Sequence, residues 1–140
     1  MVVEYERRGP NDPYWAKLKK IVTKRDGNCK FLQCLSAKEY YSLVPGHPTI
    51  KDCAHIFSAG THPDKIYWTD NVVLLSRYIH RRMDDFQNPL TGDSLSSKNE
   101  HYYWWYRIKE SAVIEYDESI DYELLLLNNI KETTDTNVTL

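Results

Sequence analysis

Three side chains in the middle of the sequence have types and spacing that suit chemistry on a polar substrate. They are His55 in DCAHIFSAG, Asn71 in TDNVVLL and His80 in RYIHRRMDD. A histidine has an ordinary pKa near ~6.5, so it exchanges protons near neutral pH, and its neutral ring also binds divalent metals. A lone histidine among apolar residues is most often a hydrogen-bonded residue at the edge of a core. The combination of the three, rather than any one of them, therefore predicts a functional site.

The surrounding sequence predicts the elements that position these three residues. Apolar runs and loop-forming residues alternate in the order strand (51–57), loop (58–70), strand (71–76) and helix (77–87). His55 then lies on the first strand, Asn71 lies where the loop meets the second strand, and His80 lies on the helix.

A helix with strong end signals is predicted before this region. Asp12 is a suitable N-cap, Pro13 occupies the first helical position and Gly27 follows the last turn. One face of this helix is apolar and belongs to the core; it contains Trp15, Leu18 and Val22. Residues 28–50 contain prolines and a glycine that break any regular period, so we expect a hairpin or a long loop there.

The C-terminal half predicts helices that pack on the core. Ser97 and Glu100 form a capping-box pattern before the aromatic helix 98–111, and a short helix is expected around residues 119–130. Aromatic rings occupy residues 102–106 and could stack on unpaired bases. Five consecutive positions cannot all face one groove, so packing in the protein is the favoured interpretation.

The residues His55, Asn71 and His80, with AHI and DNVVLL around them, resemble the HNH endonuclease family. The preceding WAKLKKIVTKRDGNC also resembles the basic helix and turn before the core of small, often phage-encoded members. This similarity covers about residues 13–85. It implies an α+β protein with a ββα-metal core of two short antiparallel strands and a helix. We expect one domain over residues 1–130, whose helical C-terminal part spans about 86–130, followed by a flexible tail at 131–140.

The resemblance implies a metal-dependent DNA endonuclease or nickase that leaves a 5′-phosphate and a 3′-hydroxyl. Phosphodiester hydrolysis needs an activated water and positive charge near the departing oxygen. His55 takes the position of the general base and His80 that of a metal ligand. Asn71 takes the position of the middle asparagine, which orients the loop or, in some members, binds the metal; orientation is favoured. One divalent ion is implied, with Mg²⁺ preferred and Mn²⁺, Zn²⁺ or Ni²⁺ compatible.

One departure from the family concerns the metal ligands. Many members have an aspartate or histidine directly before the base histidine, but this chain has Ala54. Asp52 shares the strand face of Ala54, about 6.6 Å further back along an ideal strand. Asp84 lies one helical turn beyond His80 and faces the same way. Either carboxylate could complete the site, and Asp52 ranks slightly above Asp84.

A second departure concerns zinc. Relatives with a structural zinc carry two CxxC pairs, and Ser76 and Ile79 stand where the second pair would be. No structural zinc is therefore expected. Three cysteines, Cys29, Cys34 and Cys53, cannot all pair within one chain, and nothing suggests secretion, so reduced thiols are expected.

The charge distribution favours a nucleic-acid partner only locally. The net charge is −2, yet residues 1–82 carry 14 basic and 8 acidic side chains, whereas residues 83–140 carry 4 and 12. The predicted phosphate contacts are Lys17, Lys20, Lys24 and Arg81, although solvated lysines are the ordinary alternative.

The remaining expectations concern location and alternative functions. The sequence has neither an apolar stretch of membrane length nor a signal-peptide pattern at MVVEYERRGP, so we expect a cytoplasmic protein, in the host cytoplasm if phage-encoded. Pairing of two copies is left open. The alternatives to a nuclease are a catalytically inactive DNA-binding module of the same fold, for which Ala54 is the best argument, and a protein-interaction domain.

Overall fold

The computed structural model describes residues 12–43 and 50–132, and these residues form an α+β arrangement. The predicted tail 131–140 lies outside the described residues from residue 133 onward. The elements are α1 (Pro13–Asp26), α2 (Ala37–Ser42), β1 (Lys51–His55), β2 (Val72–Ser76), α3 (Arg77–Asp84), α4 (Lys98–Glu110) and α5 (Tyr122–Asn129).

Strands β1 and β2 form an antiparallel pair in which His55 lies opposite Val72 and Lys51 lies opposite Ser76. Helix α3 begins at the next residue, because the Ser76 hydroxyl caps it by accepting a hydrogen bond from the Ile79 amide. The two strands and the helix that were predicted around the three candidate residues are therefore present in the predicted order.

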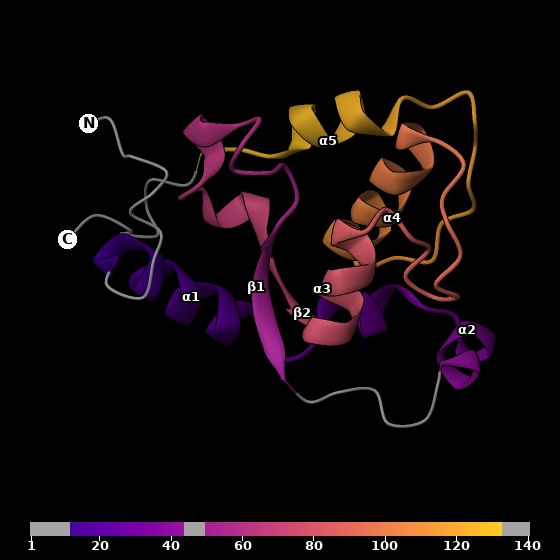
Figure 1. Ribbon diagram of the computed structural model, residues 1–140, viewed down its shortest axis with the longest axis horizontal. Helices are drawn as coiled ribbons and strands as arrows, with labels where there is room; N and C mark the ends of the chain where they lie inside the picture. The colour runs from indigo at the N-terminus through magenta and orange to yellow at the C-terminus, as the bar shows by residue number, and fades with distance from the viewer. Residues whose placement is uncertain (1–11, 44–49, 133–140) are drawn as a thin grey trace.

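Each face of this two-stranded sheet is covered by a different set of helices (Figure 1). Because side chains alternate along a strand, β1 directs Cys53 and His55 to one face and Asp52 and Ala54 to the other. The first face packs on α1 and the second packs on α3. On the first face, Val72 and Leu74 of β2 pack against Leu18 and Val22 of α1.

Helix α1 has the predicted ends. The Asp12 carboxylate accepts hydrogen bonds from the amides of Tyr14 (2.9 Å) and Trp15 (3.3 Å). Gly27 ends the helix with φ of 73°, a conformation that glycine adopts without steric penalty.

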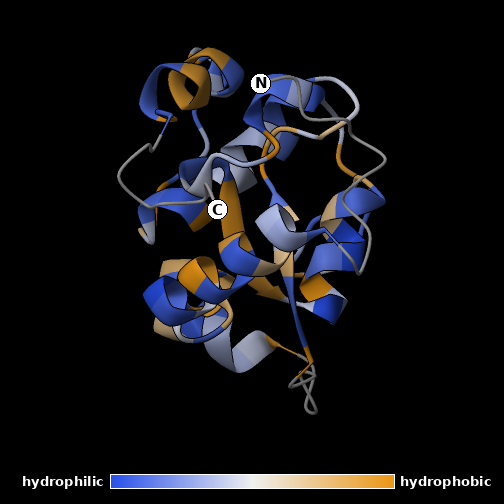
Figure 2. Ribbon diagram, turned by 90° about the vertical axis from the view of Figure 1, so that its left-hand side faces the viewer, coloured by the Kyte–Doolittle hydropathy of each residue, from blue (hydrophilic) through white to orange (hydrophobic). Residues whose placement is uncertain are grey.

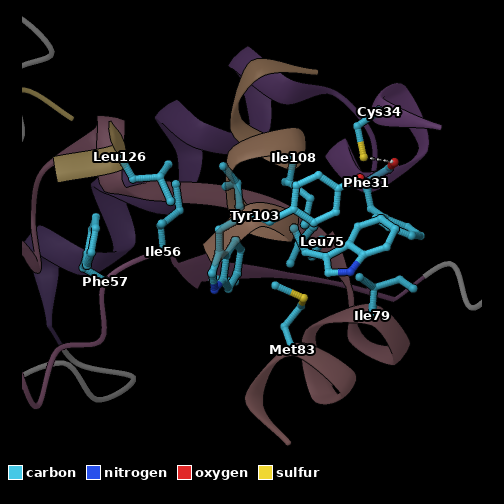
Figure 3. Packing of buried hydrophobic residues seen from close by; sticks show 14 of the residues in the cluster. Phe31, Cys34, Ile56, Phe57, Leu75, Ile79, Met83, Tyr103, Ile108 and Leu126 are labelled. Carbon is cyan, nitrogen blue, oxygen red and sulfur yellow. Dashed lines mark hydrogen bonds between the residues drawn. The ribbon is translucent and has the colours of Figure 1, made fainter. Parts of the chain in front are cut away.

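The second face of the sheet is covered by the larger core cluster, which also contains the aromatic part of α4 (Figure 3). Tyr103, Trp104 and Trp105 are buried in it, and Tyr102 and Tyr106 pack against it. The preference for packing over base stacking at residues 102–106 is therefore confirmed. The helices show both polar and apolar residues when coloured by hydropathy (Figure 2), as expected for elements that bury one side.

The prediction of a hairpin or long loop at residues 28–50 is wrong over the described part of that range. A 3₁₀ helix spans Lys30–Cys34 and is followed by α2. Ser36 and Glu39 form a capping box that starts α2, a local signal that the prolines further along obscured. The buried Arg107 guanidinium of α4 holds this segment in place through both Glu39 oxygens, at 2.7 and 3.1 Å.

No helix in residues 12–43 and 50–132 has the length and apolarity needed to cross a bilayer.

We expect His101 to make the fold less stable as the pH falls from 7.5 to 5.5. His101 in α4 lies 3.0 Å from the Met83 carbonyl and its ring packs on Phe86, and burial lowers the pKa of its imidazole. The unfolded chain, with a histidine pKa of about 6.5, then binds more protons than the folded chain, so stability present above that pH is lost below it. Urea unfolding in EDTA should show a smaller pH dependence for His101→Gln than for the wild type. An equal dependence in both proteins would contradict this assignment.

Candidate active site

His55 is held at the end of β1 by contacts on two sides. Its Nε2 lies 2.9 Å from the carbonyl oxygen of Ile66, and its ring stacks on Trp15 of α1 with centroids 5.1 Å apart and planes 21° apart. A carbonyl only accepts hydrogen bonds, so Nε2 carries the hydrogen and the neutral ring has its lone pair on Nδ1. The half-buried imidazole is therefore fixed in both orientation and tautomer, with Nδ1 as its basic atom.

Asn71 is fully buried and uses its whole amide to hold the loop between the strands. Its Oδ1 accepts from the Phe57 amide at 2.9 Å, and its Nδ2 donates to the carbonyls of Phe57 (3.0 Å) and Lys65 (3.2 Å). Lys65 directly precedes Ile66, whose carbonyl holds His55. The asparagine thus acts on the His55 ring through the loop backbone, and its side chain is engaged with protein rather than directed to a ligand.

His80 lies between the two carboxylates that the sequence offered as alternatives. Its Nδ1 is 3.1 Å from Asp52 Oδ2, and its Nε2 is 3.4 Å from Asp84 Oδ2. Arg77 also binds both Asp52 oxygens, at 3.0 and 3.3 Å. These hydrogen bonds, first from Arg77 and then from His80, hold the pKa of Asp52 below its usual range.

This arrangement offers two different places where a cation could meet His80. Two ligand atoms at about 2.1 Å from one cation lie about 3.0–3.4 Å apart, depending on the coordination angle, so both histidine–carboxylate pairs have suitable spacing. The two ring nitrogens point in different directions, so one cation cannot use both. Within the described ranges, no group of three or more His, Cys, Asp or Glu side chains forms a candidate metal site. From the described residues, a cation at either place would have His80 and one carboxylate as side-chain ligands and would complete its shell with water, as Mg²⁺ commonly does.

The candidate base and the candidate metal ligands contact different elements of the fold. His55 contacts α1 and the loop, whereas His80 contacts β1 and its own helix. Sequence reasoning missed Trp15 as the ring beneath His55 and Arg77 as the partner of Asp52. Arg77 lies one turn before His80 on the same helix, which was the available signal.

The predicted DNA contacts lie at or near the surface. Lys20 and Lys24 are exposed on α1 and Arg81 is exposed on α3, whereas Lys17 is half-buried. The three cysteines are free thiols, with Cys29 and Cys34 buried. Burial raises the pKa of Cys34 to about 12, so this thiol is protonated and not nucleophilic at neutral pH.

Comparisons of the chain with protein-family models, with curated proteins and with solved structures found no match.

Proposed function

We propose that this protein is a metal-dependent DNA endonuclease or nickase of the HNH type. The observation that carries the proposal is the position of His80 between Asp52 and Asp84, on a helix that directly follows a hairpin whose first strand ends in an oriented histidine. A nuclease needs a base near neutral pH and a group that can hold a divalent cation. The proposal assigns these roles to His55 and His80.

In the proposed reaction, His55 acts on the attacking water. Its Nδ1 takes a proton while the water oxygen forms a bond to phosphorus, and the bond from phosphorus to the 3′-oxygen breaks. The products are a 5′-phosphate and a 3′-oxygen that takes a proton from solvent to become a hydroxyl. Asn71 is a positioning residue here, because it holds the loop whose carbonyl fixes the His55 tautomer.

The geometry favours Asp84 over Asp52 as the second metal ligand, which reverses the ranking expected from the sequence. Asp52 is already bound by Arg77, so its hydrogen bond to His80 Nδ1 suits an orienting role. That bond leaves Nε2 as the coordinating atom, with Asp84 beside it. A bound Mg²⁺ or Mn²⁺ would stabilise charge on the phosphate and the departing oxygen.

Metal titrations of plasmid cleavage with Mg²⁺ and Mn²⁺ test this assignment. His80→Ala should lose cleavage at all metal concentrations, because it removes the imidazole ligand that the proposal assigns. Asp84→Asn should raise the metal concentration for half-maximal cleavage roughly tenfold or more, because losing even an outer-shell partner of a metal ligand typically costs 10–100-fold. Asp52→Asn should have a smaller effect on that concentration, because it weakens only the orientation of the ring.

Asp93→Asn is the matched control, because this exposed carboxylate lies in a loop outside the site. Cleavage by His80→Ala with an unchanged metal requirement would overturn the proposal. Salt-sensitive DNA binding by the wild type without cleavage would favour the inactive DNA-binding module, and absence of both would favour a protein-interaction domain.

A further inference from the structure

A hollow on the outer side of α3 lies next to the candidate metal ligands, and it has no role in the reaction described above. Its volume is about 480 Å³, within the range of about 300–1,000 Å³ for small-molecule sites. We call it the α3 hollow. Its wall includes Ile50, Arg77, Tyr78, Arg81, Arg82 and Asp85.

The helix period places the α3 hollow beside the candidate site. His80 and Asp84 form one row along α3, and Arg77 and Arg81 form the neighbouring row. Arg77 contributes to both places, because it binds Asp52 and also lines the hollow. A strand of nucleic acid bound at His80 would therefore pass over these arginines and reach the hollow with the next part of its chain.

Two guanidinium groups give the hollow a positive rim. Among the described residues, neither Arg81 nor Arg82 has a carboxylate partner; Arg81 is exposed. Arg82 donates to the Pro89 carbonyl at 3.1 Å and to the Tyr78 hydroxyl. Its guanidinium lies 4.3 Å from the Tyr78 ring centroid, and a Cβ at Gly92 would lie 3.1 Å from its Nη2. The turn around Gly92 thus leaves room for a fixed guanidinium, while Arg81 is a cation at the surface.

The interior of the hollow suits a base better than a second phosphate. The surface of its wall is mainly apolar, and Ile50 is 56% exposed although it is a large aliphatic side chain. Tyr78 also lines the hollow, and its ring carries the Arg82 guanidinium on one face. Asp85 places a carboxylate in the lining, which repels a second phosphate but accepts hydrogen bonds from a base. The cationic rim suits the phosphate of a nucleotide, and the apolar interior suits its base.

We infer that the α3 hollow binds one unpaired nucleotide of a DNA strand, with its phosphate on Arg81 and its base against Ile50 and Tyr78. This inference rests on the proposed function, because it takes DNA as the substrate. A paired base is stacked on both sides and enters such a hollow only after it leaves the duplex, which costs free energy. The substrate class is therefore single-stranded or locally unpaired DNA.

Fluorescence anisotropy in EDTA tests the inference without cleavage. The probe is a labelled single strand of about 15 nucleotides, a length within known single-strand site sizes, and the comparison is the same sequence as a duplex. The wild type should bind the single strand more tightly. Tyr78→Ala should weaken single-strand binding roughly fivefold or more, and Ile50→Ser roughly threefold or more, with little change for the duplex.

Further variants test the cationic rim of the hollow separately from its apolar interior. Arg81→Gln should weaken binding to both probes and reduce the dependence on salt, and Arg81→Lys should restore part of the affinity. Lys38→Gln on α2 is the matched control and should change neither probe. Ile50→Ser keeps the test valid if Tyr78→Ala fails to fold, because Ile50 is exposed.

Two results would overturn the inference: equal affinity of the wild type for single strand and duplex, or unchanged single-strand binding by Ile50→Ser. Neither depends on turnover. Single-strand binding that responds to these variants, in a protein that never cleaves DNA, would support the hollow and refute the nuclease. Metal-dependent cleavage that is unaffected by these variants would support the nuclease and refute the role of the hollow.

Discussion

The His55→Ala variant should bind DNA as the wild type does but cleave it about 10²–10⁴-fold more slowly, the range for loss of a general base. The proposed base acts in the chemical step, so its removal should lower kcat and leave the affinity for DNA in EDTA unchanged. The ring lies at the end of β1 and is only half-buried, so thermal unfolding should show a folded protein. Single-turnover cleavage with saturating Mn²⁺ gives the rate directly.

His62→Ala is the matched control for this measurement. His62 lies in the same loop region, and its Nδ1 interacts with the Thr61 hydroxyl rather than with the loop carbonyl that holds His55. It should cleave at the wild-type rate. A folded His55→Ala variant that cleaves within tenfold of the wild type would remove His55 from its proposed role.

The Asn71→Ala variant should lose about 2–4 kcal/mol of unfolding free energy, because truncation leaves the buried Phe57 amide without its acceptor and removes a donor from two carbonyls. Such a loss is large against the total of about 5–15 kcal/mol for a typical domain. Urea unfolding measures it. Asn71→Asp should be at least as damaging, because a carboxylate donates no hydrogen bond to the carbonyls of Phe57 and Lys65.

Asn128→Ala provides the comparison for Asn71→Ala, since Asn128 is exposed on α5 and surface substitutions usually change stability by less than about 0.5 kcal/mol. Cleavage measured well below the unfolding transition should also fall in Asn71→Ala, because the Ile66 carbonyl then holds His55 less firmly. An unfolding midpoint equal to that of the wild type would show that the loop is maintained without this amide.

The parts of the fold that could be predicted from the sequence are those with local causes. Asp12, Pro13 and Gly27 determine the ends of α1 through their own backbone preferences and capping groups. Short apolar runs bounded by loop-forming residues predict β1 and β2, and Ser76 caps the helix that follows. These signals lie within a few residues of the structure they specify, so no tertiary contact was needed to interpret them.

The parts that could not be predicted depend on contacts between distant residues. Arg77 reaches Asp52 only because the strand register places Leu75 opposite Asp52 and α3 begins directly after β2. That contact changes which carboxylate suits a cation, so the ranking of Asp52 and Asp84 could not be settled from spacing. The α3 hollow likewise depends on the hydrogen bond from Arg82 to the Pro89 carbonyl, a contact that the spacing of these two residues does not indicate.

The placement of the two-stranded sheet between two separate apolar clusters has a consequence for the modularity of the chain. The side chains proposed for chemistry all fall between residues 51 and 84, a continuous segment. Its strands are only five residues each, and their two faces are covered by α1 on one side and by the cluster that contains α4 on the other. A two-stranded hairpin on its own is at best marginally stable in water. The segment 51–84 is therefore not an autonomous folding unit, and grafting it into another protein would require both of its flanking helical layers.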